Sequence, residues 1–171
     1  NVAVGYQSLY ANTTGIFNTA VGYTALVSNT TGINNTALGF IALNSNVIGT
    51  DNTALGSGAL DKNTASQNTA VGRQALRFNT TGSPNDAVGY QALYSNTTGA
   101  YNVAVGSQSL YTNTTGIQNT AVGYASLNAN TVSNNTGIGN GALQSTVTGS
   151  DNTAVGSGAL FLNTEIGRAH V

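Results

Sequence analysis

The chain has 171 residues, enough for one ordinary globular domain, but its composition is not that of one. Only 5% of its residues are charged, where about 25% is typical, and its polarity comes from Asn, Thr, Ser, Gln and 22 glycines. The net charge of −1 excludes a basic field for nucleic acid or an anionic membrane, and the absence of cysteine excludes disulfides and thiolate metal sites.

One repeated unit accounts for almost the whole chain. Its copies follow one another in steps of 17 residues, with two steps of 16. The ten copies begin at Asn1, Asn18, Asn35, Asn52, Asn68, Asn85, Asn102, Asn119, Asn135 and Asn152. A repeat this regular predicts that each copy forms one supersecondary unit that stacks on the next.

A few positions of the unit hardly vary. Counted from the opening asparagine, the third residue is alanine except at Gly137, the fourth is aliphatic, the fifth is glycine and the ninth is leucine. Positions six, seven and ten vary widely, which is typical of sites that face solvent. The third, fourth, fifth and ninth positions are nearly constant from copy to copy, which indicates that they maintain the fold.

Each copy ends in a predicted turn. Positions twelve to fifteen read NTTG in five copies, and the glycine of this cluster can adopt a positive φ without steric strain. The turn glycines named by this pattern include Gly15, Gly32, Gly99 and Gly116. The two 16-residue copies lack this glycine, so we expect the missing residue to fall in the turn and the strands to keep their register.

The unit is too short and too interrupted for a typical helix. Its Thr, Val and Tyr content favours two short strands per copy, TAVG and YQAL, joined by tight bends. Such strands become stable when copies stack as rungs. The sequence therefore predicts an all-β fold, a parallel β-solenoid or β-roll of ten rungs of 16–17 residues, spanning residues 1–164.

Alternation along the strands suggests which side chains face inward. We expect the fourth and ninth residues to form a bulky inner pair in each rung. The predicted core comprises Val4, Leu9, Val21, Leu26, Leu38, Leu43, Val71, Leu76, Val88, Leu93, Val122, Leu127, Val155 and Leu160. One such pair stabilises a rung too little to order its backbone. We therefore expect another chain to approach the small Ala and Gly face, which gives a homo-oligomer.

The NTAVG core resembles the head repeats of YadA-type trimeric autotransporter adhesins. The longer segment NDAVGYQALYSNTTG, residues 85–99, is similar to repeats of bacteriophage tail-fibre and bacterial surface-fibre proteins. The resemblance covers all ten copies, although the rungs are longer than those of YadA-type heads. It implies a β-roll assembled as a homotrimer within an extracellular fibre.

The C-terminal segment 165–171 breaks the repeat. Its sequence IGRAHV, from Ile166 to Val171, matches the translation of an adaptor used in short-read DNA sequencing. We expect this segment not to be native, and we expect the chain to be a piece of a longer protein.

Groups that perform chemistry are scarce. The single histidine, His170, lies in the divergent segment, so no histidine-based catalytic triad or metal site is expected. Asp51 and Asp151 end their copies, where aspartate favours turns; calcium binding by Asp51 is a weaker alternative. We predict no catalytic residue, no metal and no cofactor, and a protein that is not an enzyme.

Two polar or aromatic columns are candidate sites. Stacking would align the first and twelfth asparagines into amide ladders, which we favour over glycosylation. The formal glycosylation sequons open at Asn12, Asn29, Asn34, Asn79, Asn96, Asn113 and Asn134. The sixth position forms an interrupted aromatic row, which would either bind sugar rings or cover an interchain seam. The row consists of Tyr6, Tyr23, Phe40, Tyr90 and Tyr124, and its four tyrosines are the candidate ligand surface.

These patterns predict a structural component of an extracellular fibre, either a tail-fibre shaft on a virion or an adhesin or filament on a bacterial surface. Its expected partner is itself, in a homotrimer or end to end, without nucleic acid or membrane insertion. One alternative is a module that binds a cell-surface glycan or receptor through the variable positions. A remote alternative is an ice-binding solenoid, disfavoured because the threonine pairs are expected in turns and not on a strand face.

Overall fold

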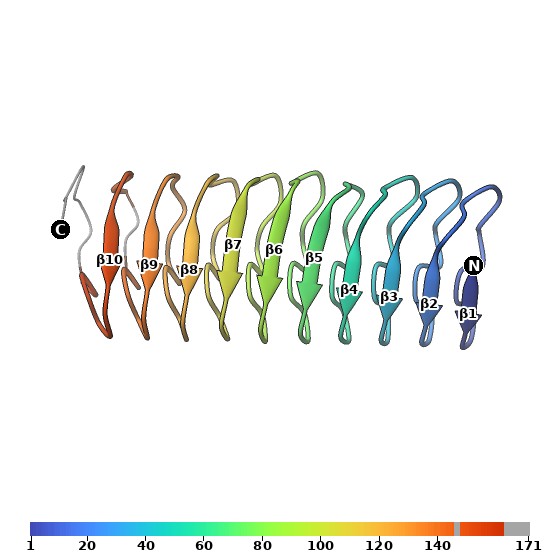
Figure 1. Cartoon of the computed structure of the whole chain (residues 1–171), viewed down its shortest axis with the longest axis horizontal. Coiled ribbons are helices and arrows are strands. Elements are labelled where there is room, and N and C mark those ends of the chain that lie inside the picture. The colour runs from blue at the N-terminus through green and yellow to red at the C-terminus, as the bar shows by residue number, and fades with distance from the viewer. Residues whose placement is uncertain (146–147, 163–171) are drawn as a thin grey trace.

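The computed structural model describes residues 1–145 and 148–162, so the segment 165–171 lies outside the described residues. Ten short strands lie in sequence order in a single parallel sheet (Figure 1). The strands are β1 (Val2–Val4), β2 (Thr19–Val21), β3 (Thr36–Leu38), β4 (Thr53–Leu55), β5 (Asn68–Val71), β6 (Asn85–Val88), β7 (Asn102–Val105), β8 (Thr120–Val122), β9 (Thr136–Ile138) and β10 (Thr153–Val155). The described residues contain no helix, so the chain is an all-β parallel solenoid in which each repeat forms one rung.

The register of the sheet follows the repeat throughout. Ala20 of β2 pairs with Ala37 of β3, one full 17-residue step away. Ala54 of β4 pairs with Ala70 of β5 across a 16-residue step, so the shorter copy does not shift its strand. The missing residue therefore falls in the turn, and this prediction is confirmed.

The second strand predicted in each copy does not form. Residues six to eleven are turns, because the seventh and ninth residues adopt a positive φ; Thr24 has φ 48° and Leu26 has φ 52°. Left-handed backbone at a leucine is unusual and unfavourable. It is held here by bonds between rungs, since Thr24 N–H donates to Tyr6 O at 2.8 Å and Leu26 N–H donates to Ala42 O at 2.9 Å. The hydrogen-bond ladder thus continues around the coil beyond the strands.

The interior is built from small residues and leucine. Third-position alanines of the strands point inward and pack with the ninth-position leucines in one cluster. Leu26, Leu43, Leu76, Leu93 and Leu127 are buried where the sequence analysis placed them, and Leu9 and Leu160 pack against the cluster from the terminal rungs.

The prediction that the fourth-position residues belong to the core is wrong. Alternation along each strand is the reverse of the one expected, because the thin coil has room only for alanine opposite leucine. Seven residues therefore lie on the outer face of the sheet, half-exposed or exposed: Val4, Val21, Leu38, Val71, Val88, Val122 and Val155. The small alanine face, expected to receive another chain, is enclosed within this one.

The turn glycines lie in the turns, but for a different reason from the one expected. Gly15, Gly32, Gly99 and Gly116 do not have a positive φ. A Cβ atom on Gly99 would lie 2.5 Å from Gly116 O of the next rung. Close approach between successive rungs, and not backbone conformation, therefore requires glycine here.

Candidate functional site

The outer face of the sheet presents two parallel columns, which we call the strand face. The fourth-position column is aliphatic in every rung: Val4, Val21, Leu38, Leu55, Val71, Val88, Val105, Val122, Ile138 and Val155. The second-position column is mostly threonine: Val2, Thr19, Thr36, Thr53, Thr69, Asp86, Val103, Thr120, Thr136 and Thr153. Both columns lie along the sheet that runs the length of the coil (Figure 1). Sequence reasoning missed this face because it turned the aliphatic column inward.

Threonines of the strand face differ in what their hydroxyl groups bind from the turn threonines that directly follow the turn asparagine, such as Thr30 and Thr80. In the turns, Thr30 Oγ1 donates to Val47 O at 3.1 Å and Thr80 Oγ1 donates to Thr97 O at 2.9 Å, each in the next rung. Within the described residues, no side-chain hydrogen bond is made by the seven strand-face threonines: Thr19, Thr36, Thr53, Thr69, Thr120, Thr136 and Thr153. Their hydroxyl groups are therefore free to bind water.

The aromatic row at position six is exposed, and its rings stack along the coil. Tyr6 and Tyr23 lie 5.2 Å apart between ring centroids, and Tyr23 and Phe40 lie 5.5 Å apart, both nearly parallel. In the middle rungs, the guanidinium carbon of Arg73 lies 5.8 Å from the centre of the Tyr90 ring. Both faces of the Tyr23 ring are therefore taken by its neighbours, whereas Tyr6, Phe40 and Tyr90 each have one such contact.

A second aromatic group lies on the turn side of the coil and was not predicted as a site. Phe78 and Tyr94 meet edge to face at 5.0 Å, and Tyr94 stacks on Tyr111 at 5.1 Å. Arg77 lies over the Phe78 ring at 5.4 Å. The 17-residue spacing of Tyr94 and Tyr111 at position ten could have revealed this group, because equal spacing in a solenoid means vertical stacking.

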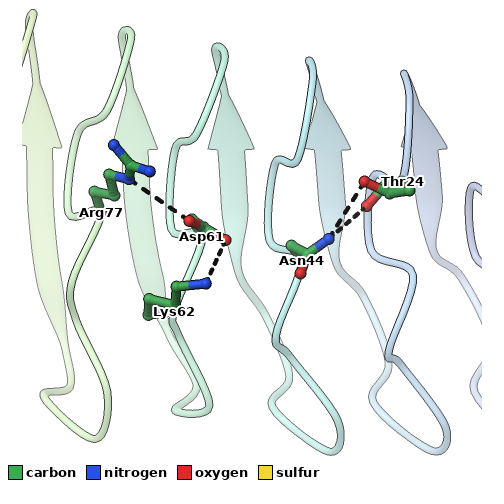
Figure 2. Close-up of polar contacts among 5 residues, drawn as sticks. All are labelled: Thr24, Asn44, Asp61, Lys62 and Arg77. Atoms are coloured by element: carbon green, nitrogen blue, oxygen red, sulfur yellow. Dashed lines mark hydrogen bonds and ion pairs between the residues drawn. The ribbon is translucent and has the colours of Figure 1, made fainter.

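Arg77 also belongs to a group of charged side chains with Asp61 and Lys62 (Figure 2). The buried carboxylate of Asp61 lies 3.4 Å from Lys62 Nζ and 3.6 Å from Arg77 Nε. In the rung before Asp61, Asn44 Nδ2 donates at 3.3 Å to both the carbonyl and the hydroxyl oxygen of Thr24, which lies one rung earlier still. The Asp61–Arg77 and Asn44–Thr24 contacts each join adjacent rungs and so contribute to the stacking of the coil.

The two predicted amide ladders are present and buried. At position one, the backbone N–H of Asn35 donates to Asn18 Oδ1 at 2.9 Å, and the Asn35 side chain donates to Gly49 O at 2.8 Å. At position twelve, Asn96 Nδ2 donates to Asn79 Oδ1 at 2.7 Å. The sequon asparagines Asn29, Asn79, Asn96 and Asn113 are buried, so they cannot accept a glycan in the folded chain, whereas the sequon residue Asn34 is exposed.

The ladder at position twelve breaks at the 16-residue rungs. There, Asn63 Nδ2 donates to Ala65 O of its own turn at 2.8 Å and does not reach the preceding rung. Asn46 Oδ1 is consequently buried without a partner, and so is Asn113 Oδ1, which precedes the other short rung. The short turns thus leave one orphan acceptor each inside the coil.

The described residues form neither a cluster of metal ligands nor a pocket. No group of three or more His, Cys, Asp or Glu side chains among them is placed to hold a metal ion. No helix of this part of the chain could cross a membrane. The arrangement suits contacts along an extended surface more than the enclosure of a small molecule.

Comparisons with protein-family models, curated proteins and solved structures gave no match.

Proposed function

We propose that the chain is a structural rod within an extracellular fibre, either the shaft of a phage tail fibre or a filament or adhesin on a bacterial surface. The observation that carries this proposal is the unbroken ladder from β1 to β10, with the same interior columns in each rung. Each rung adds about 4.8 Å to the length, which gives a rod of roughly 45 Å. The likeness of the repeat to fibre repeats supports the extracellular setting.

The fibre is proposed to assemble as a homotrimer, and the aromatic row is its seam. Tyrosine and arginine are enriched in the cores of protein interfaces, whereas aspartate is depleted. The row carries Tyr6, Tyr23, Tyr90 and Arg73, while the strand face carries Asp86. Threefold symmetry about the strand face would bring three Asp86 carboxylates together and bury unpaired hydroxyl groups, which is unfavourable.

Sedimentation equilibrium of the purified chain tests this assembly. We expect three times the mass of one chain, and we expect Tyr23→Lys with Phe40→Lys to lower the mass to that of a monomer, because two lysines would be desolvated at the seam. The matched control is Thr31→Lys with Thr81→Lys, which adds the same charge at exposed turn positions and should leave the mass unchanged. A monomeric wild-type chain at every concentration would refute the trimer.

A carbohydrate-binding module is the second candidate and is less well supported. Sugar rings stack on the faces of aromatic side chains, and the faces of Tyr23 are occupied by Tyr6 and Phe40. Specific retention of the chain on a glycan array, lost in Tyr23→Ala, would favour this candidate over a purely structural rod.

A further inference from the structure

The strand face has the features of a surface that binds an ordered lattice. Its threonines stand in register across neighbouring strands, since Thr19 pairs with Thr36, Thr36 with Thr53, and Thr53 with Thr69. A second run continues from Thr120 through Thr136 to Thr153. The hydroxyl groups therefore form a column with one group per strand, interrupted only at β6 and β7.

The repeat distances of this array are set by the sheet. Neighbouring strands lie about 4.8 Å apart, and the second and fourth residues of one strand lie about 6.6 Å apart on the same face. Both spacings are close to repeats of water oxygens on the faces of hexagonal ice. The free hydroxyl groups supply bonding sites at the repeat between strands, and the aliphatic side chains of the fourth position stand at the repeat along each strand.

The aliphatic column of the strand face also suits contact with ordered water. Methyl groups of residues such as Val71 and Val122 stand beside the hydroxyl groups in the seven rungs that carry a strand-face threonine, and water next to apolar groups is orientationally restricted. Charge is nearly absent from the face, as suits a neutral lattice, because Asp86 is its one carboxylate.

Turn threonines such as Thr30 and Thr80 cannot take this part, since their hydroxyl groups are bonded to the next rung. The exposed turn threonines Thr31 and Thr81 lie outside the sheet, without an aliphatic column of the strand face beside them.

From these observations we infer that the strand face is an ice-binding surface, whose ligand is the ordered water lattice of an ice crystal. The free threonine hydroxyls anchor the lattice and the aliphatic column orders the water between them. The inference does not depend on the fibre, because the proposed seam occupies a different column, at position six.

Thermal hysteresis and inhibition of ice recrystallisation test the inference on the purified chain. We expect measurable hysteresis and faceted crystals from the wild-type protein. Thr36→Lys with Thr53→Lys should lower the activity by about tenfold or more, because two long cationic side chains hold the lattice away from the face. The control pair Thr31→Lys with Thr81→Lys should retain the wild-type activity.

A second variant tests the same idea by gain of function. Asp86→Thr with Val103→Thr would join the two runs into a column that is unbroken from β2 to β10, and hysteresis should rise. Circular dichroism and sedimentation mass are measured for every variant, so that lost folding and lost assembly are recognised.

Three results would overturn the inference: no hysteresis from the wild-type chain, equal loss in the strand-face and control pairs, or a change of mass in the strand-face pair. The last result would make the strand face an interface between copies. A trimer that lacks hysteresis would leave the fibre proposal intact and remove only this inference.

Discussion

Adjacent residues of one strand meet very different constraints, as Ala87 and Val88 of β6 illustrate. Ala87 points into the coil and has no exposed surface, whereas Val88 points outward and is 40% exposed. The inward position is alanine in nearly every rung, because leucine from the opposite wall leaves no further room. The outward position accepts Val, Leu or Ile. Size therefore decides which residue faces inward here, and hydrophobicity does not.

The largest expected effect comes from breaking the interior at a leucine. Leu93→Ala should lower the free energy of unfolding by about 2–5 kcal/mol, because it opens a cavity in a fully buried column. Val88→Ala is the matched control on the strand face, and should change the free energy by less than about 1 kcal/mol, since its side chain stays partly in water. Urea denaturation followed by circular dichroism measures both.

Equal losses in Leu93→Ala and Val88→Ala would contradict the division into interior and outer columns. Such a result would mean that the strand face is as tightly packed in solution as the interior. A partner that buries the strand face would then have to be part of the stable fold.

The repeat predicted the solenoid, its ten rungs and its register, because equal spacing leaves few ways to stack identical units. It also predicted both asparagine ladders, since a polar residue repeated at one position must meet its own copies. These conclusions needed only the period. The register holds at the 16-residue rungs as well, where Ala54 and Ala70 remain paired, whereas the ladder at position twelve breaks there.

The inside and the outside of the strand could not be predicted in the same way. Alternation shows that Ala20 and Val21 face opposite sides, but it does not say which side is enclosed. The answer depends on the positive φ of Thr24 and Leu26, which folds the rest of the rung back over the alanine side. Leucine rarely adopts a positive φ, so the local sequence gives no signal that predicts this backbone conformation. The free strand-face hydroxyls became visible only with this correction.

A smaller change in the free energy of unfolding is expected at Gly137, the one rung whose third position is not alanine. Gly137 replaces the third-position alanine, and a Cβ atom there would lie 2.7 Å from Ser126 Oγ of the preceding rung. Ser126 Oγ donates to Gly137 O at 2.8 Å. Gly137→Ala alone should destabilise the chain by about 1–3 kcal/mol through overpacking. Ser126→Ala alone should cost about 1 kcal/mol through the lost hydrogen bond.

The two changes together should cost less than their sum, because they restore the alanine pair seen at Ala92 and Ala104. A double-mutant cycle from thermal or urea unfolding should give a coupling of about 1–2 kcal/mol. Additive losses would show that Gly137 and Ser126 are independent, and that the interior is less tightly packed than its burial indicates.

The smallest expected change in stability comes from restoring the broken asparagine ladder at position twelve. Replacing Ala65 by the dipeptide Thr-Gly would convert the short turn into the common NTTG turn and allow Asn63 Nδ2 to reach the orphan Asn46 Oδ1. One buried hydrogen bond gained should stabilise the chain by about 1 kcal/mol. Ala65→Gly is the control, since it changes the composition of the turn without its length, and should not stabilise. If the longer turn gives no gain in stability over this control, then water already satisfies Asn46 Oδ1. The missing hydrogen bond in the asparagine column would then cost the chain no stability.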